Sequence, residues 1–101
     1  MNIQITSRKF RAKDSLTSYT KDEIQKLTKF NPDIMDANVV LSFLHNNNSI
    51  KSAEITLHVP GKVFKADETS DDFRKSISIA ASKIERQLRK LKTKRLAKTR
   101  W

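Results

Sequence analysis

Basic side chains crowd the C-terminal part of this sequence. From Lys83 to Trp101 nine of them stand against a single acid, Glu85, which gives this segment a net charge of +8 in a chain whose formal net charge is +10. Crowding of like charge costs self-repulsion, and a polyanionic partner relieves that cost. A solvated, solubilising tail is the alternative explanation. The segment therefore predicts a surface that binds a polyanion.

Groups that could support catalysis are few. The chain has no cysteine, and its single glycine argues against a Gly-rich phosphate loop. His45 and His58 are expected on separate strands and lack the spacing of metal ligands. Helix capping explains the neighbouring acids Asp71 and Asp72. We therefore predict that the protein is not an enzyme and has no metal, cofactor or small-molecule substrate.

The charge pattern favours RNA among the polyanions. Lysine and arginine with almost no interleaved aromatic residues suit phosphates rather than base stacking. No helix-turn-helix or zinc module is recognisable that would place a helix in a DNA groove. A basic amphipathic helix can also lie on anionic lipid, but a domain this small needs the apolar side of its last helix for its core. An acidic protein partner stays open as a further alternative.

Apolar periodicity predicts the elements that must position these cations. Alternating residues indicate strands near residues 2–6, 37–45, 53–59 and 63–67. A basic connection, Arg8 to Lys13, follows the first strand. The first helix has its apolar stripe at Leu16, Tyr19, Ile24, Leu27 and Phe30. The chain is therefore expected to form one α+β domain of the order β-α-β-β-β-α.

Turn residues indicate where these elements end. Asn31 before Pro32 should end the first helix, because the residue before proline is pushed out of the helical region. The run from Asn46 to Ser49 predicts a hairpin loop. Pro60 and Gly61 suit the centre of a type II turn, since glycine supplies the positive second φ.

Two acids indicate where the helices begin. Asp14 is expected to be the N-cap of the first helix. Thr69 is expected to open the last helix, with Asp72 three residues on as the acid of a capping box.

The last helix is expected to have one apolar stripe and a basic back. Its apolar positions are Phe73, Ile77, Ala81, Ile84, Leu88 and Leu91. At 100° per residue, the back of the helix carries Lys75, Arg86 and Arg89. Lys83, Lys90 and Lys94 fall along one flank. We call these cations of the last helix the basic ridge.

The connections predict how the sheet and helices are arranged. A strand–helix–strand unit crosses over right-handed, so the first two strands should be parallel neighbours, extended by two antiparallel hairpins. Each helix has one apolar stripe, which predicts that both pack side by side on one face of the four-stranded sheet. Lys26 and Lys29 lie outside the stripe of the first helix and are expected to join the basic ridge.

The sequence resembles the family of ribosome hibernation promoting factors and protein Y, over nearly the whole chain. The resemblance is strongest at residues 53–62, 66–72 and 83–92. It implies a fold like that of double-stranded RNA-binding domains. It also implies binding to small-subunit rRNA in the decoding channel, where the family blocks mRNA and A- and P-site tRNA and inhibits translation in stationary phase or starvation. The family's basic positions in the last helix correspond to Lys83, Arg86, Lys90 and Lys94.

The resemblance also carries expectations about organisation. Residues 1–94 would be the ribosome-binding domain and 95–101 a short basic tail, as in the short form of the family. A monomer off the ribosome is expected. Independently of the resemblance, the sequence has no continuous apolar run typical of a signal peptide and none long enough to span a bilayer, which predicts a cytoplasmic protein without a membrane contact. Glu23 stands at a position where the family often has a basic residue. This acid weakens the rRNA contacts expected from the first helix. A general module for structured RNA, without a ribosomal role, is the alternative. The expected rRNA-binding residues are Lys83, Arg86, Arg89, Lys90, Lys94, Lys26 and Lys29.

Overall fold

The computed structural model describes residues 1–44 and 50–99, leaving out the side chains of Leu44 and of residues 92–99. The predicted order β-α-β-β-β-α is confirmed, with a short 3-10 helix added after the first helix. The elements are β1 (Asn2–Arg8), α1 (Asp14–Gln25), the 3-10 helix η1 (Lys26–Lys29), β2 (Asp36–Leu44), β3 (Ile50–Val59), β4 (Lys62–Ser70) and α2 (Phe73–Thr99). His45 and the hairpin loop predicted at 46–49 lie outside the described residues.

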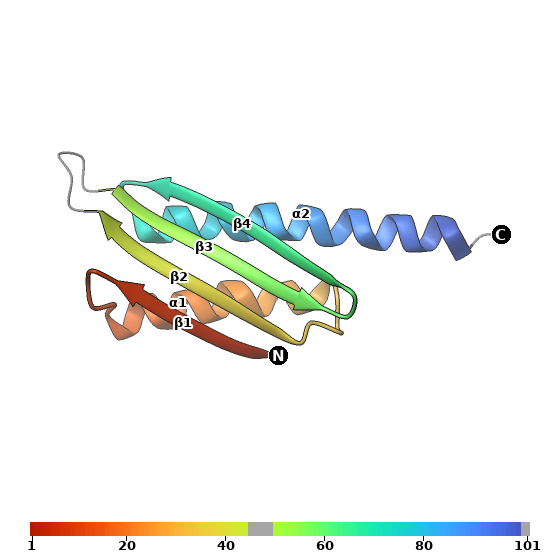
Figure 1. Ribbon diagram of the computed structural model, residues 1–101, viewed down its shortest axis with the longest axis horizontal. Helices are drawn as coiled ribbons and strands as arrows, with labels where there is room; N and C mark the ends of the chain where they lie inside the picture. The colour runs from red at the N-terminus through yellow and green to blue at the C-terminus, as the bar shows by residue number, and fades with distance from the viewer. Residues whose placement is uncertain (45–49, 100–101) are drawn as a thin grey trace.

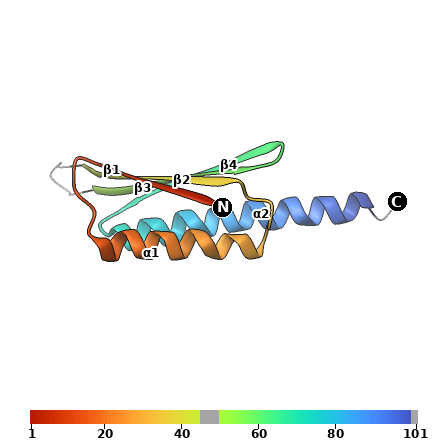
Figure 2. The same ribbon diagram turned by 90° about the horizontal axis from the view of Figure 1, so that it is seen from below.

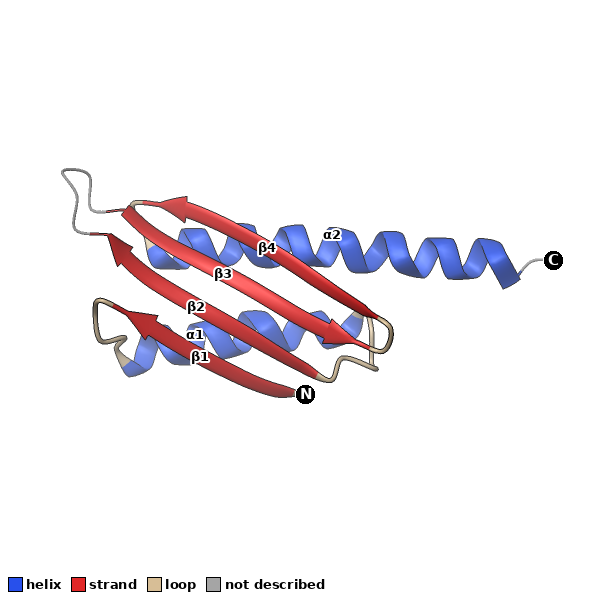
Figure 3. Cartoon of the chain, viewed as in Figure 1, coloured by secondary structure: helices blue, strands red, loops and turns tan. Residues whose placement is uncertain are grey.

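The four strands form one sheet in the order β1-β2-β3-β4 (Figures 1 and 3). β1 and β2 are parallel, and the other two neighbouring pairs are antiparallel. Parallel strands need a long crossover between them, and α1 with η1 supplies it. Both helices lie side by side on one face of the sheet (Figure 2), so the predicted topology and layers are confirmed.

The core lies between the sheet and the helices. Because side chains alternate along a strand, every second residue of each strand faces the helices. One such row, from β1 to β4, consists of Ile5, Val39, Ile55 and Ala66. The side chains with which α2 covers the sheet are Phe73, Ile77, Ala80, Ala81, Ile84 and Leu88. Their three- and four-residue spacing keeps them on one side of the helix, as predicted.

The opposite face of the sheet is polar. One of its rows, from β1 to β4, consists of Gln4, Asn38, Thr56 and Lys65. None of the described helices covers this face (Figure 2). A sheet with one packed and one solvated face shows this alternation of apolar and polar residues. The domain therefore has a single interior, which α2 and α1 close.

The turn predicted at Pro60 and Gly61 joins β3 to β4. Gly61 has φ +79°, as the third residue of a type II turn requires. A Cβ added to Gly61 would meet no atom within 4 Å, so the backbone conformation, rather than crowding, favours glycine here.

The predicted start of α2 was wrong. Thr69 and Ser70 are still in β4, where Thr69 faces Ser52 of β3, and the helix begins only at Phe73. Asp72 is the residue that caps it, because its Oδ1 accepts a hydrogen bond from the backbone N–H of Arg74 at 2.9 Å. Pairing with β3 therefore prevails over the local capping-box signal.

The predicted N-cap of α1 was wrong by one residue. Lys13 occupies the cap position in an extended conformation, and its side chain makes no capping hydrogen bond. Asp14 is the first helical residue, where its carboxylate still favours the positive end of the helix dipole. At the other end, the helix predicted to continue to Asn31 narrows into η1 after Gln25.

The burial of Ile84 yields a test of the core. Its side chain is fully buried, and truncating such a side chain loses transfer free energy and leaves a cavity. We expect Ile84→Ala to lower the free energy of unfolding by about 2–5 kcal/mol in chemical denaturation. The exposed neighbour Ser82 provides the control. Ser82→Ala should change the free energy of unfolding by less than about 0.5 kcal/mol, and equal effects of the two substitutions would contradict the packing.

Candidate nucleic-acid interface

The side of α2 that faces away from the sheet is basic. The apolar residues of the helix point to the sheet, so the cations between them lie on the outer side and the two flanks. The exposed lysines and arginines in the described part of the ridge are Lys75, Lys83, Arg86, Arg89 and Lys90. Lys75 was not among the predicted contacts, although the helical spacing had placed it at the back of the helix.

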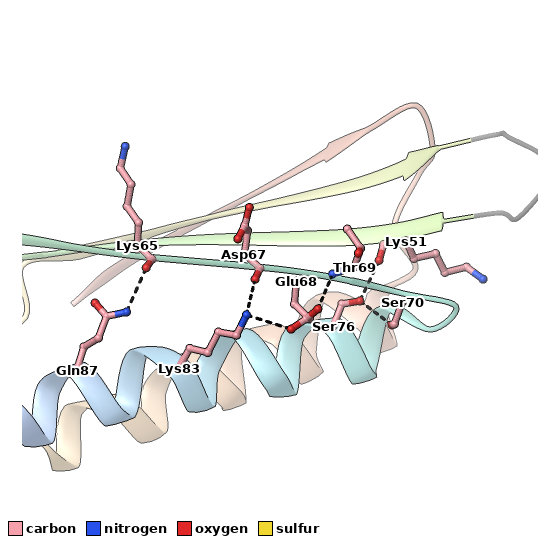
Figure 4. A network of polar contacts seen from close by, with 9 residues as sticks. All are labelled: Lys51, Lys65, Asp67, Glu68, Thr69, Ser70, Ser76, Lys83 and Gln87. Atoms are coloured by element: carbon pink, nitrogen blue, oxygen red, sulfur yellow. Dashed lines mark hydrogen bonds and ion pairs between the residues drawn. The ribbon is translucent and has the colours of Figure 1, made fainter.

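Lys83 lies on the flank of α2 that faces β4 (Figure 4). Its Nζ forms an ion pair with Oε2 of Glu68 at 3.1 Å and donates a hydrogen bond to the carbonyl oxygen of Asp67 at 3.2 Å. One turn further along, Nε2 of Gln87 donates to the carbonyl oxygen of Lys65 at 3.2 Å. These contacts tie α2 to β4. Lys83 therefore has a structural role, and the phosphate contact expected from it stays a prediction.

Lys83 also lowers the pKa of the Glu68 carboxyl. The largest cause is the hydrogen bond that Lys83 donates, followed by one from the backbone N–H of Thr69 and by the positive charge of Lys83. Each favours the ionised form, against a smaller opposing effect of desolvation. The carboxylate of Glu68 therefore stays ionised to lower pH than usual and compensates part of the charge of Lys83.

Arg89 lies on the other flank of α2, toward η1. Its Nη2 is 3.5 Å from Oε2 of Glu85, and its guanidinium carbon lies 5.1 Å from the centre of the Phe30 ring. Arg74 lies in the same way over Tyr19, at 5.0 Å. Both contacts are cation–π interactions between α2 and the first helical segment. Because Arg89 and Lys83 lie on opposite flanks, the predicted cations do not form one straight row.

Arg86 and Lys90 differ from Lys83 and Arg89 in their contacts. Both side chains are exposed, four residues apart and therefore about one turn from each other. Within the described residues, no ion pair or hydrogen bond engages either of them. They are thus the ridge cations whose charge is least compensated by the protein itself.

The predicted cations of the first helical segment lie in η1. Lys26 forms an ion pair with Glu23, with Nζ 3.1 Å from Oε1, so this acid compensates the lysine. Lys29 is exposed at the end of η1 and precedes Phe30, over which Arg89 lies. Of the two lysines, Lys26 is thus compensated by an acid, whereas Lys29 adjoins the aromatic residue that Arg89 contacts. The side chain of Lys94 lies outside the described residues, although the backbone of α2 continues through that position to Thr99.

The described residues contain neither a metal site nor a membrane-spanning helix. No group of three or more histidine, cysteine or acidic side chains in this part of the chain is placed to hold a metal ion. None of the described helices combines the length and the apolar character that crossing a membrane requires.

The fold and the exposed ridge define a small α+β domain with a basic helical surface. Residues 3–96 match the family described as sigma 54 modulation protein / S30EA ribosomal protein, and the chain belongs to this family. The match extends past residue 94, and the predicted division into a domain of 1–94 and a tail of 95–101 stays a prediction.

Curated relatives named ribosome hibernation promotion factor are similar over most of this chain. The identity is 31% over 93 residues for the protein of Deinococcus radiodurans, covering 90% of this chain and 49% of the relative. It is 29% over 99 residues for Lactococcus lactis subsp. cremoris, covering 98% and 50%, and 30% over 87 residues for Staphylococcus aureus, covering 86% and 46%. The chain therefore spans about half the length of these relatives.

Two solved structures have a similar fold. The protein Y N-terminal domain of Thermus thermophilus superposes with a TM-score of 0.80 at 26% identity, covering 90% of this chain and 99% of that domain. A ribosomal subunit interface protein from Coxiella burnetii superposes with a TM-score of 0.82 at 24% identity, covering 92% and 99%. The second similarity concerns the fold alone.

The contact between Lys83 and Glu68 predicts a pH effect. The pKa of Glu68 is lower in the folded state than in the unfolded state. The contact therefore contributes its full stability at pH values above the pKa of Glu68 in the unfolded chain. This contribution is lost as the pH falls through the pKa of Glu68 in the folded protein. Lys83→Met should therefore raise the pKa of Glu68 toward its ordinary value, as followed by NMR of the carboxyl carbon. Lys75→Met, which removes an exposed cation elsewhere on α2, should leave that titration unchanged. An unshifted Glu68 in the Lys83 variant would show that the contact does not persist in solution.

Proposed function

We propose that this chain binds the small ribosomal subunit through its rRNA and occupies the decoding channel. There it would exclude mRNA and the A- and P-site tRNAs and inhibit translation in stationary phase or starvation. Membership of the S30EA family and the names of the similar proteins support a ribosome-associated role. The observation that carries the proposal is the exposed pair Arg86 and Lys90, whose charge no described side chain compensates, on a helix fixed by the core.

The rigidity of α2 makes these cations effective ligands for phosphates. Ile84 and Leu88 are buried on the sheet side of the same turns, so the backbone beneath Arg86 and Lys90 is held in place. Each phosphate neutralised by a fixed cation releases condensed counterions, which favours binding at low salt. Arg89 and Lys29 extend this surface toward η1, while Lys83 and Lys26 contribute charge that Glu68 and Glu23 partly compensate.

The composition of the ridge favours recognition of RNA shape. The described stretch of α2 from Arg74 to Leu91 contains no aromatic residue, so base stacking is not its mode of binding. Phosphate contacts position a protein without reading sequence. Folded rRNA presents phosphates in a fixed arrangement, and a rigid basic helix beside η1 can match such an arrangement.

The size of the domain is compatible with blocking a channel. It extends 55 Å along its longest axis and 24 by 19 Å across. The sheet and the helices cannot deform enough to admit another chain between them, because the interior of the domain is close-packed. A domain held in the decoding channel by its ridge would therefore compete with mRNA and tRNA for the same space.

Reversing the charge of the uncompensated pair tests the proposal. We expect Arg86→Glu together with Lys90→Glu to reduce co-sedimentation with small ribosomal subunits by at least about tenfold. The slope of log affinity against log salt concentration should become shallower, by an amount that corresponds to roughly two phosphate contacts. Both side chains are exposed, so circular dichroism and thermal unfolding should change little.

The matched control reverses two lysines on β4. Lys62 and Lys65 are exposed and lie outside the ridge, so Lys62→Glu together with Lys65→Glu should bind subunits within about twofold of the parent once the general charge effect is corrected. Bound protein should also be displaced by mRNA plus initiator tRNA. Equal affinity for arbitrary duplex RNA would instead support a general module for structured RNA. Unchanged affinity in the ridge variant would exclude this surface.

A further inference from the structure

The positive charge of the chain is concentrated in two segments. The C-terminal segment from Lys83 onward carries a net +8, and the segment from Arg8 to Lys13 carries four cations and no acid. All remaining residues together carry a net charge of −2. The whole positive excess therefore lies in the ridge segment and in the connection between β1 and α1, which the proposed function leaves without a role.

The two segments lie at different ends of the molecule. The connection between β1 and α1 lies beside the first turn of α2, at the end of the long axis opposite the C-terminus (Figures 1 and 2). Arg74 at that end and Arg86, the nearer residue of the exposed pair in the ridge, are twelve residues apart on one helix, or about 18 Å along its axis. This exceeds the Debye length of about 10 Å at 0.1 M salt, so the charges of Arg74 and of the exposed ridge pair are largely screened from each other.

The connection is anchored by an aromatic side chain. The ring of Phe10 stacks on that of Phe73, the first residue of α2, with centroids 4.5 Å apart and planes at 16°. Phe43 of β2 packs against the same Phe73 ring at 6.5 Å. Phe10 is half-buried, whereas the four cations around it are exposed. The segment is therefore held by its apolar residue, and its four cations are on the surface.

Lys9 has a left-handed backbone conformation, which is more common for other residue types. Its φ is +66°, and it is the only non-glycine residue in the described part of the chain with a positive φ. Glycine adopts this left-handed conformation readily and asparagine tolerates it, whereas a long side chain is disfavoured there. Residues with such a backbone conformation cluster at functional sites, and this observation draws attention to the turn at Lys9.

Further cations at this end strengthen the positive field. Lys51 donates from Nζ to the carbonyl oxygen of Asp71 at 3.0 Å, and Arg74 and Lys75 follow in the first turn of α2. A shallow depression at this end is lined by Leu16, Lys51, Asp71, Asp72, Phe73, Arg74 and Lys75. Counting Asp14 with Asp71 and Asp72, the described residues here have seven cations against three carboxylates.

We propose that the segment Arg8–Lys13, with Lys51 and Arg74 beside it, is a second RNA-binding surface. It would hold the phosphates of an RNA segment separate from the one that contacts the ridge. The inference rests on the proposed function, since it assigns a further contact to the same RNA partner. Lysines and arginines without an exposed aromatic residue among them suit phosphates, and their separation from the ridge suits two neighbouring RNA segments rather than one groove.

A triple variant can remove the charge without disturbing the fold. Lys9→Asn places a residue that tolerates positive φ, and Lys13→Asn supplies the capping side chain that α1 lacks. With Arg11→Gln, the variant K9N/R11Q/K13N loses three charges and should unfold at a temperature no lower than the parent. We expect its affinity for purified small subunits to fall about tenfold. The slope of log affinity against log salt concentration should become shallower, by an amount that corresponds to roughly two phosphate contacts.

The matched control removes three charges elsewhere. Lys21→Gln, Lys62→Gln and Lys65→Gln replace exposed lysines of α1 and β4, and this variant should bind within about threefold of the parent. An equal loss in both triple variants would overturn the proposal, because it would reflect net charge alone. Parent-like affinity of K9N/R11Q/K13N would overturn it as well, while loss of binding in the Arg86 and Lys90 variant would still support the ridge. The reverse pattern would contradict the ridge and leave this surface standing.

Directed cleavage distinguishes RNA from ribosomal protein at this surface. The chain has no cysteine, so Ser15→Cys, at an exposed position in the first turn of α1, provides a unique attachment point for an iron chelate. On the small subunit, hydroxyl radicals from this site should cleave rRNA at positions different from those cleaved from Ser82→Cys on α2. Absence of rRNA cleavage from position 15, with cleavage from position 82 retained, would mean that this end faces protein and would overturn the proposal.

Discussion

The packing of α2 on a sheet with one apolar face is the constraint on which the rest of the structure depends. Ile77 and Ile84 are fully buried against the sheet, and this fixes the rotation of the helix about its axis. Since successive residues turn by 100°, every cation of α2 then has a defined direction. Lys83 faces β4, Arg89 faces η1, and Arg86 points away from both. The core thus decides which charges meet the protein and which meet the solvent.

The cations of α2 are alike in the sequence but differ in their surroundings in the folded protein. These surroundings give them different roles. Lys83 links two elements through Glu68 and the backbone of β4, and Arg74 and Arg89 lie on aromatic rings that they help to cover. Such contacts engage positive charge with the protein before any ligand arrives. Arg86 and Lys90 keep theirs exposed. A count of charges along the chain treats all five residues alike, whereas the folded arrangement separates them.

Periodicity in the sequence was sufficient to predict the order of elements, the parallel pairing of the first two strands and the turn at Gly61. Each of these depends on residues close in sequence or on general rules of chain connection. The start of α2 was missed because the capping signal at Thr69 competes with pairing to Ser52, which is distant in sequence. The partner of Lys83 was missed for the same reason, since Glu68 becomes its neighbour only once α2 has folded back over β4. No local pattern indicates such contacts.

The contacts that tie α2 to β4 have a consequence for association between chains. β4 is an edge strand of the sheet, and unoccupied backbone groups at an edge can recruit a strand from another molecule. The carbonyl oxygens of Lys65 and Asp67 already accept hydrogen bonds from Gln87 and Lys83 of the same chain (Figure 4). A strand adding along this edge would have to displace those side chains first. α2, the helix that carries the ridge, therefore also protects the edge strand β4 against aggregation by strand addition.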